Sequence, residues 1–313
     1  MIKQPGIFLD MTAADYHADP CPEPSFTQSI GKVLLDQSPA HARLAHPRLA
    51  PPAADDEEAE KYVSAQAIGD AAHAVLIGRG KQIAVIDYPD FKKNDAKTLR
   101  DIARADGKIP ILPKHMARAY AMVNAAREQL AAVNLSHLFT EGRGHGEVVL
   151  AWQENDLWLR TMIDWSAHEH RLVVDYKSTG LNCAPHVVED RPSVLGWDIQ
   201  AAMHERGLDA LDPDNAGRRK HYYVNQENEP PYALTVIEIS EADLTMGRKK
   251  LAMALDIWSR CVASGHWPAY PAETVISRPR GFLETKFLER EIAHHQRGQA
   301  PTNERHPDNI LAG

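Results

Sequence analysis

Cysteine is scarce in this chain. Among 313 residues there are only three cysteines, Cys21, Cys183 and Cys261, which lie far apart and show no CxxC spacing. An odd number of widely separated cysteines favours free thiols over a disulfide framework. Three thiolates also fall short of the four that hold an iron–sulfur cluster. We therefore expect neither disulfide bonds nor a cluster.

Long apolar runs are missing as well. No stretch approaches the roughly 20 apolar residues that a membrane-spanning helix needs. The first ten residues, MIKQPGIFLD, lack the basic segment and the apolar segment of a secretory signal. These absences predict a cytoplasmic protein with no membrane partner.

The chain has no excess of positive charge either. Its formal net charge is -8 at pH 7, which argues against a uniformly basic surface that binds nucleic acid without specificity. A local basic groove remains compatible with this balance, because part of the acidity lies in the run from Asp55 to Glu58. Two catalytic motifs are absent too, the Gly-x-Ser-x-Gly elbow of hydrolases and the glycine-rich phosphate loop.

What the sequence does contain is typical of a globular protein. Hydrophobic residues make up 43% and charged residues 25% of the chain, and its length lies between one large domain and two. We expect residues 1–60 to form an N-terminal arm and an acidic loop packed on a core of residues 61–280. Residues 281–313 are expected to form a polar tail that is partly disordered.

Three short apolar stretches each carry one acid: Glu147 in 146–150, Asp164 in 162–165 and Asp175 in 173–177. Turns near 155–156 and 169–170 would make these stretches an antiparallel meander, with position 147 opposite 164 and 164 opposite 175. Directly opposed residues have Cβ atoms roughly 4.5–5.5 Å apart, and like charges at that distance destabilise a sheet. The pattern therefore predicts a cation among the acids.

Lys177 can supply only part of that charge. It follows Asp175 by two residues, so the alternation of a strand places both side chains on one face. One lysine cannot neutralise three acids. A hard divalent ion can, and Mg²⁺ commonly binds one or two carboxylates together with waters and substrate phosphates. We expect Mg²⁺ as the cofactor, with Mn²⁺ able to replace it.

Other regions have simpler patterns. The sequence predicts a strand at 83–86, a long helix at 114–133, and strands at 221–226 and 232–239. Ser240 and Asp243 resemble a capping box that opens a helix ending at Ser264, with Gly265 as its stop.

The series Glu, Asp and Asp-x-Lys on successive strands resembles the PD-(D/E)XK nuclease superfamily. A preceding helix at 61–77 carries Gly-Asp-Ala-Ala-His at 69–73, and a following helix at 194–206 carries Gln200. This order is similar to the RecB-like branch, and most similar to RecE-type phage and prophage exonucleases. The resemblance covers roughly residues 25–280. It implies an α/β (α+β) fold with a restriction-endonuclease-like core, in which helices flank a mixed sheet containing an antiparallel meander.

The resemblance also implies a metal site. Asp164, Asp175 and the backbone carbonyl of Tyr176 would bind the divalent ion. His73 would reach the same cluster from its helix, as a ligand of one ion or of a second. Glu147 would hold a water on the ion or bind it directly.

Three further residues are implied to act on the substrate. Lys177 would orient the attacking water and stabilise charge on the phosphate. Gln200 would position Lys177 or the scissile phosphate. His204 stands four residues after Gln200, where relatives often carry tyrosine, and would contact a DNA phosphate.

The activity implied by the resemblance is exonucleolytic hydrolysis of linear double-stranded DNA, 5′ to 3′, in phage-type recombination by strand annealing. A ring-shaped homo-oligomer and a single-strand annealing recombinase as partner are implied as well. Two alternatives remain, a Cas4-like or repair nuclease acting on single strands or flaps, and a non-catalytic DNA-binding protein with the same fold. A zinc site at His168 and His170 is a further alternative, although both residues lie in a predicted turn.

Overall fold

The computed structural model describes residues 1–51 and 64–298. Its main sheet has six strands in the order β1-β4-β5-β6-β7-β8, and only β6 and β7 are parallel neighbours. The sheet is thus mixed, as predicted. The strands are β1 (Gly6–Phe8), β4 (Gly144–Glu154), β5 (Leu157–Ala167), β6 (Leu172–Thr179), β7 (Lys220–Glu227) and β8 (Leu234–Glu238). A separate two-stranded sheet pairs β2 (Ile83–Val85) with β3 (Ile109–Ile111).

Strands β4, β5 and β6 form the predicted antiparallel meander. Asn155 and Asp156, with φ of 46° and 66°, make the first turn, and two positive φ values in a row suit the right-handed twist of a tight hairpin. The second turn contains His168, Glu169 and His170. The pairs Gly146↔Trp165 and Trp165↔Val174 establish the predicted registers, in which 147 faces 164 and 164 faces 175.

The ladder is interrupted where the acids lie. Between β4 and β5, the pairing passes from Gly146↔Trp165 to Val148↔Ile163 and omits Glu147, whose φ is 50°. Between β5 and β6, pairing ends at Trp165↔Val174, one residue before the two acids. The β4–β5 pairing thus skips Glu147, and the β5–β6 pairing ends just before Asp164 and Asp175, so these acids form no regular rung of these ladders.

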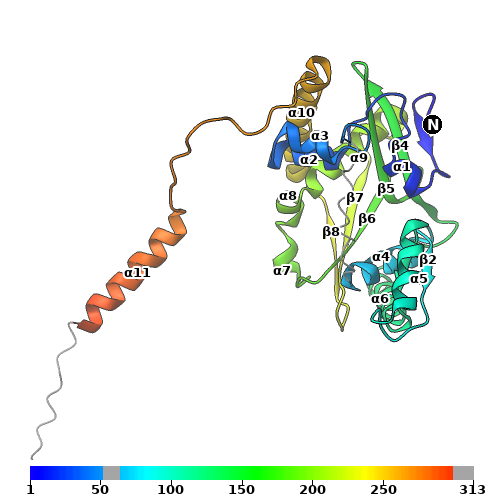
Figure 1. Cartoon of the computed structure of the whole chain (residues 1–313), viewed down its shortest axis with the longest axis horizontal. Coiled ribbons are helices and arrows are strands. Elements are labelled where there is room, and N and C mark those ends of the chain that lie inside the picture. The colour runs from blue at the N-terminus through cyan, green and yellow to red at the C-terminus, as the bar shows by residue number, and fades with distance from the viewer. Residues whose placement is uncertain (52–63, 299–313) are drawn as a thin grey trace, which may run out of the picture. The chain divides into compact units, whose positions relative to one another are not determined.

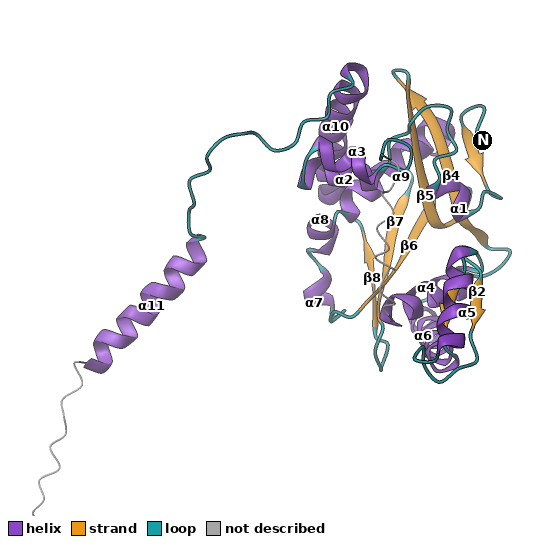
Figure 2. Ribbon diagram, viewed as in Figure 1, coloured by secondary structure: helices purple, strands orange, loops and turns teal. Residues whose placement is uncertain are grey.

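Helices cover the sheet in two groups (Figures 1 and 2). The first group includes α4 (Ser64–Ile77), α5 (Asn94–Ala105) and α6 (Pro113–Ala132). The second includes α2 (Gln28–Asp36), α3 (Pro39–Ala45), α9 (Trp197–Leu211) and α10 (Glu241–Ser264). The shorter helices are α1 (Ala13–His17), α7 (Pro185–Val188), α8 (Arg191–Leu195) and a 3₁₀ turn, Pro213–Asn215.

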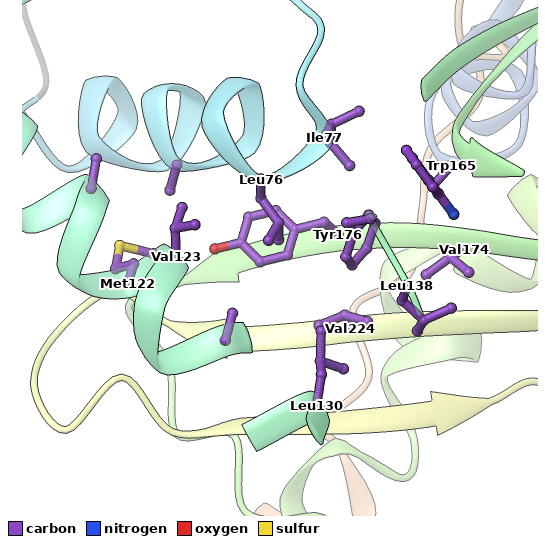
Figure 3. Close-up of a cluster of buried hydrophobic side chains, with 14 of the residues drawn as sticks. Leu76, Ile77, Met122, Val123, Leu130, Leu138, Trp165, Val174, Tyr176 and Val224 are labelled. Atoms are coloured by element: carbon purple, nitrogen blue, oxygen red, sulfur yellow. The ribbon is translucent and has the colours of Figure 1, made fainter. Parts of the chain in front are cut away.

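Each helix group closes its own hydrophobic core. Val174 and Tyr176 of β6 pack with α4 and α6, whereas Val173 packs with α2, α9 and α10. Alternate residues of β6 thus point into different cores, so this strand is buried on both faces. Figure 3 shows Tyr176 in the first core, near Leu76 of α4 and Val123 of α6.

The helix expected at 194–206 is interrupted. Gly196 adopts φ 76° and ψ 25°, so α8 ends before it and α9 begins after it. The left-handed conformation suits glycine because it has no Cβ. Sequence periodicity predicted one continuous helix because 196 is the only glycine in an otherwise helical pattern.

Elsewhere the predicted elements agree with the structure within one to three residues. Ser240 caps α10 by accepting a hydrogen bond from the Asp243 N–H, and Gly265, with φ 67°, ends the helix. The acidic run 55–58 of the expected loop lies outside the described residues, and so do residues 299–313 of the expected polar tail.

Residues Met1–Tyr270 form one compact unit and Pro271–Gly313 a second. In the second, Gly281–Gly298 is a helix, α11, which sequence analysis did not predict. No proline or glycine interrupts residues 282–297, and Leu, Glu, Lys and Arg are good helix formers. Among the described residues, no helix combines the length and the apolar character needed to cross a membrane.

Candidate active site

Strand β6 carries the Asp-x-Lys pair. Asp175 is 1% exposed, and its Oδ1 accepts a hydrogen bond of 3.1 Å from Lys177 Nζ. Tyr176 between them points the other way, into the first core, where its hydroxyl donates to Gln226 Oε1 at 2.6 Å. The buried tyrosine thereby fixes the rotation of the strand and holds Asp175 and Lys177 on the face towards α9.

The two charges of this pair stabilise each other. Burial raises the pKa of Asp175, and the nearby Asp164 carboxylate adds to that rise against the opposing effect of Lys177. Burial by itself would lower the pKa of Lys177, but Asp175 and Asp164 outweigh it and raise that pKa. Lys177 is therefore a cation at neutral pH, bonded to Asp175 and attracted by the Asp164 charge.

The Asp164 side chain takes the place of one backbone hydrogen-bond partner where the β5–β6 pairing ends. Its Oδ2 accepts a hydrogen bond of 2.9 Å from the Tyr176 backbone N–H, and the same oxygen lies 3.4 Å from His73 Nε2. Burial opposes ionisation of Asp164, but His73, Lys177 and the Tyr176 N–H together hold its pKa well below the usual range. The carboxylate is thus a fixed negative charge at the end of the paired segment.

His73 reaches this cluster because α4 approaches β6 closely. A Cβ on Gly69, one turn earlier on α4, would lie 2.4 Å from Ser178 Oγ, so the helix can take this position only without a side chain there. Burial opposes protonation of His73, but the Asp164 charge outweighs that effect and raises the pKa of the imidazole. In the 69–73 motif, Gly69 therefore allows α4 to approach β6 closely, and this approach brings His73 to Asp164.

Glu147 joins the cluster from β4. It is 4% exposed and adopts φ 50°, an uncommon conformation for a non-glycine residue. Burial raises its pKa; the His73 imidazole opposes this rise, and Asp164 adds to it. The structure thus brings Glu147, Asp164, Asp175, His73 and Lys177 into one electrostatic group, as the sequence predicted.

Gln200 approaches the cluster from α9, and its partner differs from the expected one. Its Nε2 donates a hydrogen bond of 2.8 Å to Asp175 Oδ1. Sequence analysis predicted a contact with Lys177 or with the scissile phosphate. Instead, Gln200 and Lys177 both donate to the same carboxylate oxygen, so Gln200 acts on Lys177 only through Asp175.

His204 does not occupy the expected position at the DNA surface. Its side chain is 0% exposed, with Nδ1 3.6 Å from Asp175 Oδ2 and its ring stacked near His221 at 6.5 Å. Burial lowers the pKa of this imidazole. A phosphate contact is incompatible with this placement, because α9 turns the residue inward, behind Asp175. Helical spacing correctly placed Gln200 and His204 on one face but could not tell which of them reaches solvent.

Tyr223 belongs to the site and was missed by sequence analysis. It lies on β7 directly beside Asp175 in the parallel register, and it is 1% exposed. Its hydroxyl lies 3.3 Å from Gln200 Oε1, and its ring lies under Lys177 Nζ at 5.6 Å from the centroid. The strand pattern around it gave no signal, because the parallel pairing of β6 and β7 joins segments separated by three helices and a 3₁₀ turn.

The donor set fits a hard divalent ion. In each aspartate, one oxygen is held by protein donors: Oδ2 of Asp164 and Oδ1 of Asp175. The other oxygen accepts no hydrogen bond from the described residues. Two such oxygens resemble the sparse protein contribution that Mg²⁺ accepts, with waters and phosphate oxygens completing the shell.

The described residues show no group of three or more His, Cys, Asp or Glu side chains already converged on a single ion. Asp164 and Asp175 therefore form no closed cage with a third such side chain among these residues. His168 and His170, the alternative zinc pair, lie in the β5–β6 turn, where His170 Nδ1 is 2.8 Å from Ser166 Oγ and the His168 ring is near His137.

A cleft of about 330 Å³ opens beside the cluster. Asp164 and Gln200 lie in its wall with Gln28 and Ser29 of α2 and with Arg160 of β5. Arg160 forms an ion pair with Asp19 at 3.2 Å and donates a hydrogen bond to the Tyr16 carbonyl. The N-terminal segment thus forms one wall of the space in front of the acids.

A model of one protein family matches residues 53–277, and its description reads PDDEXK-like domain of unknown function (DUF3799). The chain belongs to this PDDEXK-like family. The match includes every acid of the cluster together with Lys177, Gln200 and Tyr223. The fold, a mixed sheet with an antiparallel meander between helices, agrees with the membership.

Comparison with known proteins adds one solved structure to this PDDEXK-like assignment. A protein from Eubacterium rectale, provisionally named an exonuclease, aligns with a TM-score of 0.52 and 10% sequence identity. The alignment covers 89% of this chain and 98% of that one. At this identity, the likeness supports the fold. No curated protein matches the chain significantly.

Proposed function

We propose that this protein is a metal-dependent exodeoxyribonuclease that hydrolyses linear double-stranded DNA. The observation that carries the proposal is the joining of Asp164, Asp175 and Lys177 at a break in the sheet. Each carboxylate accepts hydrogen bonds from the described residues on one oxygen only, and the Lys177 ammonium donates to Asp175 and is attracted by the charge of Asp164. Membership of a PDDEXK-like family and the fold shared with a provisionally named exonuclease support the same reaction.

The proposed roles of the residues follow from their charge: the acids bind metal and the lysine stabilises the phosphate. Asp164, Asp175 and the Tyr176 carbonyl would hold Mg²⁺ or Mn²⁺, with Glu147 and His73 beside them. A bound divalent ion supplies Lewis-acid stabilisation of phosphate charge and a lowered pKa of water. The Lys177 ammonium, which is bonded to Asp175, would stabilise negative charge on the phosphate. Gln200 keeps the Asp175 carboxylate in place.

The wider setting is proposed from the RecE-type resemblance alone. It comprises 5′-to-3′ polarity, a ring-shaped homo-oligomer, a single-strand annealing recombinase as partner, and action in the cytoplasm during phage-type recombination. Size-exclusion chromatography with light scattering tests the oligomer, since a ring must have at least three times the 34.8 kDa of one chain.

Digestion of linear duplex DNA labelled at its 5′ or 3′ end tests the activity. With Mg²⁺ or Mn²⁺, the parent protein should release label progressively from the 5′ end, leave closed circles intact, and stop with EDTA. Asp175→Asn and Lys177→Met should each reduce the rate by roughly 100-fold or more, because each removes a charge that stabilises the transition state. Circular dichroism should show an unchanged fold.

The matched controls are Asp95→Asn and Lys92→Met near α5, which remove the same charges at exposed positions. Parent-like digestion by both active-site variants would refute the site. Cleavage confined to single strands or flaps would support the Cas4-like alternative. Duplex binding without any cleavage would identify a non-catalytic DNA-binding protein.

A further inference from the structure

Tyr223 is a buried residue to which neither the family match nor the motif assigns a part. It sits on β7 beside Asp175, and its side chain makes three contacts that all concern the candidate active site. Its hydroxyl lies 2.9 Å from the Trp197 carbonyl and 3.3 Å from Gln200 Oε1. Its ring faces Lys177 Nζ. A buried tyrosine hydroxyl generally finds a hydrogen-bond partner, and one partner here is the Gln200 amide that also donates to Asp175.

Asp175 and the Tyr223 hydroxyl together determine which way the Gln200 amide points. Ionised Asp175 can only accept hydrogen bonds, so the NH₂ group of Gln200 must face it, as the 2.8 Å contact shows. The amide oxygen then faces Tyr223, whose O–H is the donor available there. One hydroxyl hydrogen shared between the Trp197 carbonyl and Gln200 Oε1 fixes the start of α9 and the amide together.

The ring acts on the other donor to Asp175. Trp197 stacks on Tyr223 with centroids 4.9 Å apart and planes at 8°, which prevents the tyrosine ring from tilting. Lys177 Nζ lies 5.6 Å from the centroid of the Tyr223 ring, within the range in which a cation is attracted by an aromatic face. The ring thus gives the ammonium a second partner besides the Asp175 carboxylate.

We propose that Tyr223 is a positioning residue of this site, which aligns both donors to Asp175, Gln200 through its hydroxyl and Lys177 through its ring. The inference rests on the proposed function and deepens it. In a site of this kind, groups behind the ligands keep the carboxylate oriented, and their loss commonly costs 10–100-fold in metal affinity or activity.

A double-mutant cycle with Tyr223→Phe and Gln200→Ala tests the hydroxyl. Mn²⁺ affinity without DNA and kcat and KM on duplex DNA should be measured for the parent, both single variants and the double variant. Each single variant should weaken Mn²⁺ binding and lower kcat by roughly tenfold with little change in KM. The double variant should be no worse than Gln200→Ala, because the hydroxyl acts through that amide.

Tyr223→Leu tests the ring. It should lower kcat further than Tyr223→Phe does, and this extra loss should disappear in a Lys177→Met background, where no ammonium remains to be supported. The matched control is Tyr222→Phe, which removes a hydroxyl from the next residue, where it donates to Glu238 Oε2 at 2.9 Å on the opposite face. Tyr222→Phe should leave Mn²⁺ affinity and kcat at parent values.

Additive effects of Tyr223→Phe and Gln200→Ala would overturn the inference, and so would losses that only follow a lowered melting temperature. Failure of the proposed function is distinguishable from this result. In that case the parent protein cuts no DNA, or Asp175→Asn cuts it normally, while the coupling in Mn²⁺ affinity between Tyr223 and Gln200 can still be measured.

Discussion

At the scale of single residues, the Asp164 carboxylate connects the backbone of β6 to the charged groups of the site. Its carboxylate takes the Tyr176 N–H, which would otherwise lose a partner where β5 and β6 separate. A buried N–H without a partner costs free energy, so the acid is needed by the sheet as well as by the chemistry. His73 and Lys177 balance its charge.

His221 lies behind the site, and its pKa is shifted in the opposite direction from that of His73. It is 3% exposed, neither ring nitrogen has a hydrogen-bond partner among the described residues, and burial lowers its pKa from 6.5 to about 3. Above pH 6.5 the imidazole is neutral in both folded and unfolded chains. Below it, the unfolded chain takes up a proton that the folded protein excludes, so stability falls as the pH drops from 6.5 towards about 3.

The variant His221→Leu should therefore flatten the acid side of the stability curve. The slope removed is up to about 1.4 kcal/mol per pH unit, and stability at pH 7 should stay the same or rise, because two unsatisfied nitrogens disappear. Urea unfolding at pH 7 and pH 5 measures both effects. The control His186→Leu changes an exposed histidine, and an equal flattening there would contradict this account.

Residue identity and spacing were enough to predict that the acids and the lysine lie together, because they stand on short strands with fixed alternation. They were not enough for Gln200, His204 and Tyr223. The partner of a helical side chain depends on how the helix is rotated against the sheet, and the sequence of α9 permits several rotations. Only packing shows that His204 points inward.

At the scale of elements, close helix packing sets the position of Gln200. A Cβ on Gly247 of α10 would lie 2.1 Å from the Asp198 carbonyl oxygen of α9, so α10 rests directly on the backbone two residues before Gln200. Lys250, on the same helix, donates a hydrogen bond of 2.6 Å to Asp198 Oδ2. The two contacts hold the start of α9 in place.

Gly247→Ala should push α9 away and misplace the Gln200 amide. Overpacking of this kind costs about 1–3 kcal/mol, and the midpoint of urea unfolding should fall accordingly. Mn²⁺ affinity should weaken as well. Met246→Ala changes the neighbouring exposed position on α10 and should do neither. A Gly247→Ala protein with parent stability and parent metal affinity would show that the contact is readily relieved.

The elements themselves differed in how well the sequence predicted them. The meander β4–β5–β6 was predictable to the register, because its turns are short and its apolar alternation is regular. The break at Gly196 was missed because one glycine in a helical pattern is usually tolerated. Helix α11 was missed because its composition is polar on average, although it contains good helix formers.

At the scale of the whole molecule, the site depends on a connection that no local pattern reveals. Strand β7 returns parallel to β6 after α7, α8 and α9, and this return places Tyr223 beside Asp175. Helix α4 arrives from the opposite side with His73. The candidate active site is therefore assembled from β4, β5, β6, β7, α4 and α9. Each of these elements contributes at least one of its side chains.

The central claim is that these distant segments together hold one divalent ion. Electron paramagnetic resonance of Mn²⁺ measures this directly, since bound ions lose the signal of the free aquo ion. The parent protein should remove about one equivalent of Mn²⁺, or two if His73 serves a second ion. Asp164→Asn and Asp175→Asn should each abolish that binding, while Asp95→Asn keeps it. Unchanged binding by both active-site variants would contradict the account.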